Sequence, residues 1–449
     1  MRDRKKKCNI TGGFMKRRAL QDLINWKNNP TRKPLLLHGA RQVGKTWLME
    51  EFGRTCFTHV IYINFERNLH MRDLFGRGEL DPQQLIQGIE TEFNTKITAP
   101  DTLLIFDEIQ AAPLAITSLK YFYEETPQYH IIGAGSLLGV ALHEGVSYPV
   151  GKVESMTLYP LSFYEFLDAL GETQLHELLV RQQWKLLAVF KEKLLTYLKE
   201  YMIVGGMPEV VAAFVAHRDF QKVRKLQKQI LDAYEKDFSK HVPKDVLPKV
   251  QAVWHSISSQ LSKENKKFQY SLIEANSRAK QFEDAIEWLL NSGLIYKVTK
   301  VTKPALPLIG YTHASIFKLF MLDIGLLSAM SGLKIQILLE GDKLFTEFKG
   351  ALTEQYVLQE LMGLQDITIM YWGNDTGMAE VDFLVQYDGQ IIPIEVKASV
   401  NLRAKSLKTY IDKYHPTVAL RTSQADYKQT DSLYDIPLFM ISNFPQVTA

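Results

Sequence analysis

The chain has 449 residues, a length that fits two to four domains. A hydrophobic content of 46% and a charged content of 23% are typical of a globular protein with a sizeable core, and they exclude a disordered or fibrous chain. The net charge of +3 is too small to indicate a nucleic-acid partner by itself. The one dense basic run, at 2–7, lies in a tail that we assign to residues 1–15.

The two cysteines, Cys8 and Cys56, provide neither a disulfide framework nor the spacing of a metal site. No apolar stretch has membrane-spanning length, and the basic N-terminus lacks the apolar core of a signal peptide. We therefore expect a cytoplasmic protein without a membrane partner.

A phosphate-binding loop pattern, G-x-x-x-x-G-K-[ST], follows the apolar run at 35–37. Its members are Gly39, Ala40, Arg41, Gln42, Val43, Gly44, Lys45 and Thr46. The glycines allow backbone N–H groups to face a phosphate, and the helix that follows adds its positive N-terminal end. The pattern predicts an ATP site in which Lys45 reaches the β- and γ-phosphates and Thr46 binds Mg²⁺ through its hydroxyl.

Two acids end a second apolar run, at 103–106. Four consecutive apolar residues favour a strand buried on both faces, as in a parallel sheet, and ligands of such sheets bind at the carboxyl ends of the strands. Asp107 is therefore expected to coordinate Mg²⁺, directly or through water. Glu108 is expected to orient or deprotonate the water that attacks the γ-phosphate.

Alternating strand-like and helix-like stretches predict a parallel-sheet domain over 16–165. The expected strands are 35–38, 60–65, 103–107 and 130–135. Ser136 follows the last of them and is either a sensor of the γ-phosphate or the N-cap of a helix. Helical spacing of apolar residues predicts a helical lid over 166–245.

Several of these segments resemble the AAA-type ATPases of prokaryotes that carry a C-terminal domain of unknown function, DUF4143. The matching pieces are the phosphate-binding loop, Phe-Asp-Glu-Ile-Gln110, Gly-Ala-Gly-Ser-Leu137, Tyr159-Pro-Leu-Ser-Phe163 and Gly205-Gly-Met-Pro-Glu209. The resemblance implies a P-loop fold of the RecA or AAA kind, ATP and Mg²⁺ as cofactors, and a homo-oligomer as one assembly.

One position departs from that family. Many relatives carry Gly-Arg before the Pro-Leu-Ser-Phe segment, where this chain has Gly151-Lys152. Lysine keeps the charge but loses the two-pronged donor geometry of an arginine finger. Arg41 and Arg54 are other candidates, so the finger is not assigned.

The segment 246–305 has the order helix, helix, helix and strand pair, which predicts a winged-helix-like module. Residues 277–281 precede and begin its expected recognition helix, with Lys263, Lys266 and Lys267 upstream. These residues either contact nucleic acid, with DNA favoured over RNA, or form a solvated face.

A second chemical site is expected in 306–449. Asp388-Gly389 is a strong hairpin signal, and pairing Tyr387 with Gln390 places Asp382 opposite Glu395, with Cβ atoms ~5 Å apart. Lys397 projects from the same side because it lies two residues along the strand. Two facing carboxylates favour a divalent cation, whose ligands would be Asp382, Glu395 and the helical Glu354.

This constellation resembles the restriction-endonuclease-like superfamily with its PD-(D/E)-x-K core, although the proline is absent. The resemblance implies catalytic roles for Asp382, Glu395 and Lys397. Lys405 and Lys408, on the helix-like stretch that follows, either line the phosphate path or are simply exposed to solvent. The expected protein is an α/β ATPase that couples ATP binding and hydrolysis to action on nucleic acid, with a metal-dependent phosphodiesterase domain. The alternative is an ATPase switch that binds DNA or a protein partner without cleavage.

Overall fold

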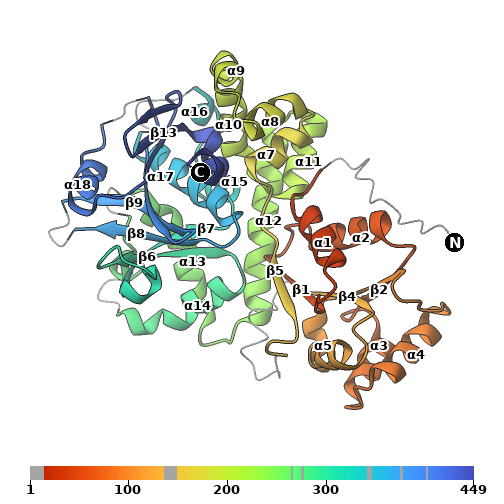
Figure 1. The fold of residues 1–449 in the computed structure, drawn as a ribbon. Helices are drawn as coiled ribbons and strands as arrows, with labels where there is room; N and C mark the ends of the chain where they lie inside the picture. The colour runs from red at the N-terminus through yellow and green to blue at the C-terminus, as the bar shows by residue number, and fades with distance from the viewer. Residues whose placement is uncertain are drawn as a thin grey trace. The chain divides into compact units, whose positions relative to one another are not determined.

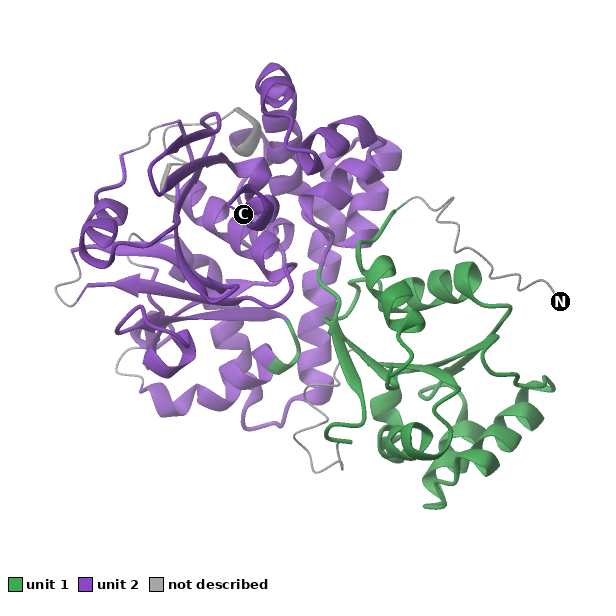
Figure 2. Cartoon of the chain, in the orientation of Figure 1, with its two compact units in different colours: residues 1–159, 291–293 green, residues 160–290, 294–449 purple. Residues whose placement is uncertain are grey.

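The computed structural model describes residues 15–135, 149–263, 266–274, 278–340, 346–374, 378–400 and 403–448. The chain forms two compact units, one of residues 1–159 with 291–293 and one of residues 160–290 with 294–449 (Figure 2). Within the described residues, no helix is long and apolar enough to cross a membrane. Ser136 and Ser277 lie outside the described residues.

The first unit is built on a parallel sheet of five strands among the described residues, in the order β2-β3-β4-β1-β5. The strands are β1 (Leu35–His38), β2 (His59–Asn64), β3 (Thr102–Asp107), β4 (His130–Ala134) and β5 (Glu154–Thr157). The first four confirm the predicted strands. The fifth was not predicted, because its sequence Glu-Ser-Met-Thr is polar and its residues are at most half-buried.

Helices cover both faces of this sheet (Figure 1). They are α1 (Ala19–Asn28), α2 (Lys45–Cys56), α3 (Leu69–Gly76), α4 (Pro82–Phe93), the 3₁₀ turn η1 (Ile109–Ala111) and α5 (Pro113–Glu125). Successive strand side chains point to opposite faces. Leu36, Leu104 and Phe106 accordingly pack into one apolar cluster with α3, α4 and α5. Because helices cover both faces of the sheet, its strands β1, β3 and β4 are buried on both sides, which explains their continuous apolar runs.

The second unit begins with helices, as expected for 166–245. They are α7 (Phe163–Ala169), α8 (Thr173–Val180), α9 (Trp184–Val189), α10 (Lys191–Val204), α11 (Pro208–His217) and α12 (Phe220–His241). Ser162 caps α7 through a capping box, accepting from the Glu165 backbone N–H while the Glu165 side chain accepts from the Ser162 N–H. These helices belong to the same compact unit as the C-terminal part of the chain.

The middle segment contains α13 (Leu247–Leu261), two 3₁₀ turns, η2 (Tyr270–Leu272) and η3 (Ala279–Gln281), and α14 (Glu283–Asn291). The strand pair β6 (Ile295–Val301) and β7 (Thr312–Met321) follows. This pair is the edge of a larger sheet, in which β6 also pairs with β8 (Thr368–Gly373). The winged-helix prediction is therefore not confirmed, because β6 joins the pair to the larger sheet through β8.

The large sheet has eight strands among the described residues, in the order β12-β13-β11-β10-β9-β8-β6-β7. Its other strands are β9 (Glu380–Tyr387), β10 (Gln390–Val396), β11 (Ala419–Ser423), β12 (Lys428–Thr430) and β13 (Leu433–Pro437). The β9–β10 register runs from Tyr387 opposite Gln390 to Phe383 opposite Ile394. The predicted hairpin register is confirmed.

Helices and turns complete the second unit. They are η4 (Leu308–Tyr311), α15 (Ile324–Met330), α16 (Ile335–Glu340), α17 (Thr346–Met362), α18 (Lys405–Tyr414), η6 (Leu438–Asn443) and α19 (Phe444–Val447). α18 packs on β9 and β10 through Leu407 and Tyr410, which lie in an apolar cluster with Trp372. α17 packs against β10 and α15, and residues 351–361 of this helix are buried.

Candidate functional site

The phosphate-binding loop has the backbone that its glycines permit. Gly44 has φ 94° and precedes α2, and Gly39 has φ 139°. Both values lie in the region that side chains with a Cβ rarely adopt. A Cβ on Gly39 would also lie 2.4 Å from the Leu158 carbonyl oxygen. The loop therefore connects β1 to the N-terminus of α2, the position at which backbone N–H groups bind anions.

Lys45 is buried within this loop. Its Nζ donates to the carbonyl oxygens of Gly39, at 2.7 Å, and Ala40, at 2.9 Å. Burial lowers the pKa of Lys45 to about 8, although the nearby carboxylates of Glu108 and Asp107 act in the opposite direction. The ammonium is partly desolvated and donates to carbonyl oxygens, so a nearby phosphate would stabilise its positive charge.

Asp107 ends β3 and is linked to the loop through Thr46. The Thr46 hydroxyl donates to Asp107 Oδ2 at 2.8 Å, and the backbone N–H of Glu108 donates to Oδ1 at 3.0 Å. The two predicted Mg²⁺ ligands are thus hydrogen-bonded to each other across the sheet edge. A hydroxyl and a carboxylate oxygen in contact beside a phosphate-binding lysine fit the oxygen ligands that Mg²⁺ prefers.

Tyr62 also binds Asp107, and sequence reasoning missed it. Its hydroxyl donates to Asp107 Oδ2 at 2.6 Å and accepts from Asn64 Nδ2 at 3.4 Å. A signal was present, since the second predicted strand is followed along the chain by the strand that ends in Asp107. Parallel pairing of these two strands places the polar Tyr62 and Asn64 beside the acid.

Glu108 sits in a left-handed turn between β3 and η1, with φ 48°. This conformation is uncommon for a residue with a side chain and is enriched at functional sites. Glu108 Oε2 accepts from Gln110 Nε2 at 2.6 Å. The carboxylate predicted to act on water is therefore held by a side chain two residues along the chain.

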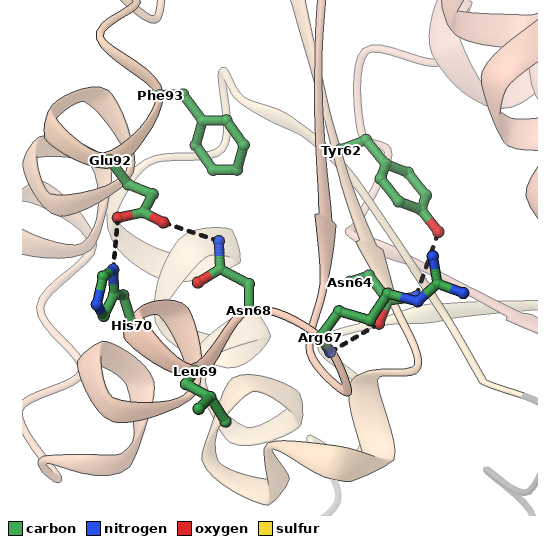
Figure 3. A pocket seen from close by; sticks show the side chains of 8 residues that line it. All are labelled: Tyr62, Asn64, Arg67, Asn68, Leu69, His70, Glu92 and Phe93. Atoms are coloured by element: carbon green, nitrogen blue, oxygen red, sulfur yellow. Dashed lines mark hydrogen bonds and ion pairs between the residues drawn. The ribbon is translucent and has the colours of Figure 1, made fainter.

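A pocket of about 510 Å³ opens beside Tyr62 at the carboxyl end of β2. Figure 3 shows Asn68 and His70 on one side, both bonded to Glu92 of α4, and Tyr62, Asn64 and Arg67 on the other. Leu69 is 62% exposed at this pocket. Tyr62 therefore both lines the pocket and donates its hydroxyl to Asp107.

The second predicted site lies in the second unit, on α17, β9 and β10. Asp382 Oδ2 accepts from the backbone N–H of Val396 at 2.8 Å, next to Glu395. Lys397 Nζ donates to Glu395 Oε1 at 2.6 Å. Glu354 of α17 faces the same cluster, because its charge shifts the pKa of both Asp382 and Glu395. The structure thus brings Glu354, Asp382, Glu395 and Lys397 together.

Two lysines that were not predicted for this site enter the cluster. Lys266 pairs with Glu354, and the fully buried Lys318 lies 4.0 Å from Glu354 Oε2 and 2.5 Å from Glu380. Lys266 had been grouped with a basic nucleic-acid face. Its pairing with Glu354 removes it from that face.

The three carboxyl groups of this cluster have pKa values that are shifted in different directions. Burial, with Glu354 and Glu395 nearby, raises the pKa of Asp382 well above its usual range. Burial also opposes the charge of Glu354, but Lys266 and Lys318 outweigh it and lower the pKa of Glu354. Burial raises the pKa of Glu395 in spite of Lys397.

The fit of this cluster to a metal ion is incomplete. Two buried oxygens, Glu354 Oε2 and Glu395 Oε2, have no hydrogen-bond partner among the residues that the structure describes, which suits a cation. Across the part of the chain that the structure describes, however, no group of three or more acidic, histidine or cysteine side chains is arranged to hold a metal ion. The lysines take up part of the negative charge that a metal would neutralise.

Three segments of the chain match protein-family models. Residues 31–167 match the AAA domain, residues 195–336 a domain of unknown function (DUF8612), and residues 349–441 a domain of unknown function (DUF4143). The AAA match covers the phosphate-binding loop, Asp107 and Glu108. Residues 31–167 are therefore similar to the AAA domain. No curated protein matches the sequence.

Several solved structures are similar to the chain, each with low sequence identity. A Walker-type ATPase of Pyrococcus abyssi is 16% identical, with a TM-score of 0.45, and the match covers 73% of this chain and 99% of that one. The ORC2 protein of Aeropyrum pernix in its ADP form is 12% identical, with a TM-score of 0.30 and coverage of 72% and 90%. The Thermotoga maritima RuvB Holliday junction branch migration motor is 12% identical, with a TM-score of 0.29 and coverage of 63% and 90%.

The finger candidates of the ATPase domain have partners within it. Lys152 Nζ pairs with Glu124 at 2.9 Å, and Arg54 pairs with Glu51 on the exposed face of α2. Arg41 is half-buried in the loop itself. None of the three is thereby assigned as the finger.

A buried arginine connects two parts of the ATPase domain. Arg17 donates through one guanidinium nitrogen to the Val43 carbonyl of the phosphate-binding loop, at 3.0 Å, and through the other to the Tyr159 carbonyl, at 2.6 Å. Arg17 is 7% exposed. Tyr159 is the residue at which the first compact unit ends.

The two most family-specific motifs meet inside the second unit. The Leu161 N–H of the Pro-Leu-Ser-Phe segment donates to the Gly206 carbonyl of the Gly-Gly-Met-Pro segment at 2.7 Å. The Gly206 N–H donates to the buried Asp323 at 2.6 Å. A Cβ on Gly206 would lie 2.2 Å from the Leu161 carbonyl oxygen, so the close approach requires glycine. These two motifs therefore join the helices of the second unit through a close backbone contact.

Proposed function

We propose that this protein binds ATP with Mg²⁺ and hydrolyses it in the AAA-type domain, as a switch that acts on nucleic acid. The observation that carries the ATPase proposal is the joint contact of the phosphate-binding loop and the acidic strand end. Thr46 and Asp107 are hydrogen-bonded to each other. Lys45 directly precedes Thr46 in the chain, and Glu108 directly follows Asp107.

Lys45 has a defined role in this scheme. When a triphosphate enters, its ammonium exchanges the carbonyl oxygens of Gly39 and Ala40 for the β- and γ-phosphate oxygens. Thr46 and Asp107 would hold Mg²⁺, which, when bound, neutralises charge on the phosphates. The loop N–H groups at the start of α2 bind the remaining phosphate oxygens.

Glu108 orients the attacking water and accepts its proton. Gln110 fixes the carboxylate on one side through a hydrogen bond to Oε2. General-base catalysis of this kind contributes about 10²–10⁴-fold to rate. Glu108 directly follows the carboxyl end of β3, the edge at which ligands of parallel sheets bind.

Two substitutions test the ATPase proposal. Lys45→Ala should abolish measurable ATP binding, because it removes the only loop cation expected to reach both phosphates. Glu108→Gln should retain binding and lower turnover by at least about 10²-fold. Glu125→Gln, at the exposed end of α5, is the matched control and should behave as the parent. Unchanged hydrolysis in Glu108→Gln would remove Glu108 from its role.

The nucleic-acid part of the proposal is supported by exposed basic residues in the second unit. Lys405 and Lys408 lie on the solvent side of α18, and Arg278 and Lys280 are not buried at η3. We propose DNA in preference to RNA as the partner. Affinity for a DNA duplex should fall steeply as salt rises, since phosphate contacts release counterions. Affinity that is independent of salt, or absent, contradicts this part.

A metal-dependent phosphodiesterase in the C-terminal domain is the second candidate function. The observation that favours it is the meeting of Glu354, Asp382 and Glu395 with two carboxylate oxygens that lack a hydrogen-bond partner within the described part of the chain. The ion pairs of Lys266 and Lys318 favour instead the alternative in which the domain binds nucleic acid without cleavage.

Manganese titration separates these two alternatives. If the acids hold a cation, Mn²⁺ should raise the melting temperature of the parent and leave that of Asp382→Ala unchanged, and the parent alone should nick DNA. If the lysines replace the cation, neither the melting temperature nor DNA integrity responds to Mn²⁺. Lys185→Ala, at an exposed position of α9, is a control for general loss of charge.

A further inference from the structure

Tyr62 lies on an edge strand, yet its side chain reaches the centre of the ATP site. β2 pairs in parallel with β3, with Asn64 opposite Asp107. Ile61 and Ile63 point into the apolar cluster that also contains Phe106, so Tyr62, Asn64 and Asp107 point to the opposite face. The pairing register and the pleat together fix Tyr62 beside the carboxylate.

The Asp107 carboxylate is held from three directions. Oδ2 accepts from the hydroxyls of Tyr62, at 2.6 Å, and Thr46, at 2.8 Å, and Oδ1 accepts from the Glu108 N–H, at 3.0 Å. Asp107 is 4% exposed, so these donors replace most of its water. A buried carboxylate of this kind adopts the rotamer that its donors dictate.

Of these three donors, Tyr62 is the one whose side chain has no other expected part in nucleotide binding. Thr46 is expected to turn a lone pair to Mg²⁺, and the Glu108 N–H is part of the catalytic turn. We propose that Tyr62 is a positioning residue that keeps Asp107 oriented toward Mg²⁺ when ATP is bound. This inference rests on the proposed ATPase function.

The surroundings of Tyr62 keep it a donor. Partial burial, with the hydrogen bond to Asp107, raises the pKa of Tyr62 to about 12, so the phenol is protonated at neutral pH. One side of the ring borders the open pocket of Figure 3 and not a tightly packed core. A phenylalanine therefore fits the same space, and Tyr62→Phe removes the hydroxyl alone.

The experiment measures binding of a fluorescent ATP analogue to the full chain, with Mg²⁺ and with EDTA. Tyr62→Phe should weaken binding about tenfold in Mg²⁺ and raise the Mg²⁺ concentration for half-maximal binding by a similar factor, as expected for the loss of a hydrogen bond to a charged group. Its affinity in EDTA should equal that of the parent. Tyr129→Phe is the matched control, since it also removes only a phenol hydroxyl from the first unit, from a ring that packs on the apolar cluster of Phe106, which Tyr62 does not join.

Two results would overturn the inference. One is an affinity of Tyr62→Phe for the ATP analogue that equals that of the parent at every Mg²⁺ concentration. The other is an equal loss in Mg²⁺ and in EDTA, which indicates a structural role only. Lys45→Ala in the same assay tests the underlying function separately. If Lys45→Ala binds as the parent does, the ATPase proposal fails whatever Tyr62→Phe does.

Discussion

Lys45 occupies an environment that disfavours its own charge until a phosphate arrives. Its Nζ has two carbonyl oxygens as acceptors, and burial lowers its pKa to about 8. A bound triphosphate would favour the ammonium strongly and raise that pKa again. At a pH at which Lys45 of the free protein has lost its proton, nucleotide binding is therefore coupled to uptake of that proton.

This coupling gives a pH dependence with a definite sign. Below about pH 8 Lys45 is charged in the free protein, so ATP affinity should be flat there. Above about pH 8 the affinity should fall, by up to about tenfold per pH unit, because binding must restore the proton. Calorimetry from about pH 7 to about pH 9.5 measures it. Lys45→Arg, which keeps its proton, should show a flatter profile, and a flat profile in the parent contradicts the prediction.

At the same scale, the residues that could be predicted from sequence are those with a fixed local spacing. Lys45, Thr46 and the Asp107–Glu108 pair belong to short patterns whose chemistry follows from neighbours along the chain. Tyr62 could not be placed with certainty, because its role depends on which strand pairs with β3. Lys266 and Lys318 were missed at the second site for the same reason, since both come from segments distant in sequence.

At the scale of elements, α17 is a buried helix with polar residues at its centre. Gln355 bonds both backbone groups of Met321, and Gln359 bonds the Ile324 N–H and the Tyr201 hydroxyl. Glu360 accepts from the Phe163 N–H at 2.8 Å and from Ser442. Apolar periodicity alone does not predict that such a helix is buried, because its polar side chains form hydrogen bonds with backbone groups of neighbouring segments.

Glu360 makes the stability of the second unit depend on pH. Burial raises the pKa of Glu360 from 4.5 to about 7. A carboxyl group whose folded pKa is raised stabilises the fold below its unfolded pKa and loses that contribution as pH rises through the folded value. The free energy of unfolding should therefore fall between about pH 4.5 and about pH 7, by up to about 3 kcal/mol for this group.

The substitution Glu360→Gln isolates this effect. Its amide can accept from Phe163 and donate to Ser442, so both hydrogen bonds have counterparts. In urea unfolding, Glu360→Gln should equal the parent near pH 5 and exceed it near pH 8. Glu209→Gln, at an exposed position of α11, is the control and should follow the parent at both values. An equal difference at both pH values would contradict the assignment.

At the scale of the whole molecule, the parallel sheet was predictable and the second unit was predictable only in parts. The strands of the first unit are continuous apolar runs, which the two layers of helices explain. The Asp388-Gly389 turn fixed the register of one hairpin. The strand pair of the middle segment gave no sign of its partner, because local sequence does not encode that β6 pairs with β8, some seventy residues away.

Arg17 ties the phosphate-binding loop to the residue at which the first unit ends. Both of its bonds end on carbonyl oxygens, so neither depends on the identity of a partner side chain. The loop cannot move away from Tyr159 by more than a fraction of an ångström without stretching a charge-assisted hydrogen bond. Two residues further on, Leu161 donates its backbone N–H to Gly206, and the Phe163 N–H donates to Glu360. Only the backbone from Tyr159 to Leu161 separates these two sets of hydrogen bonds along the chain.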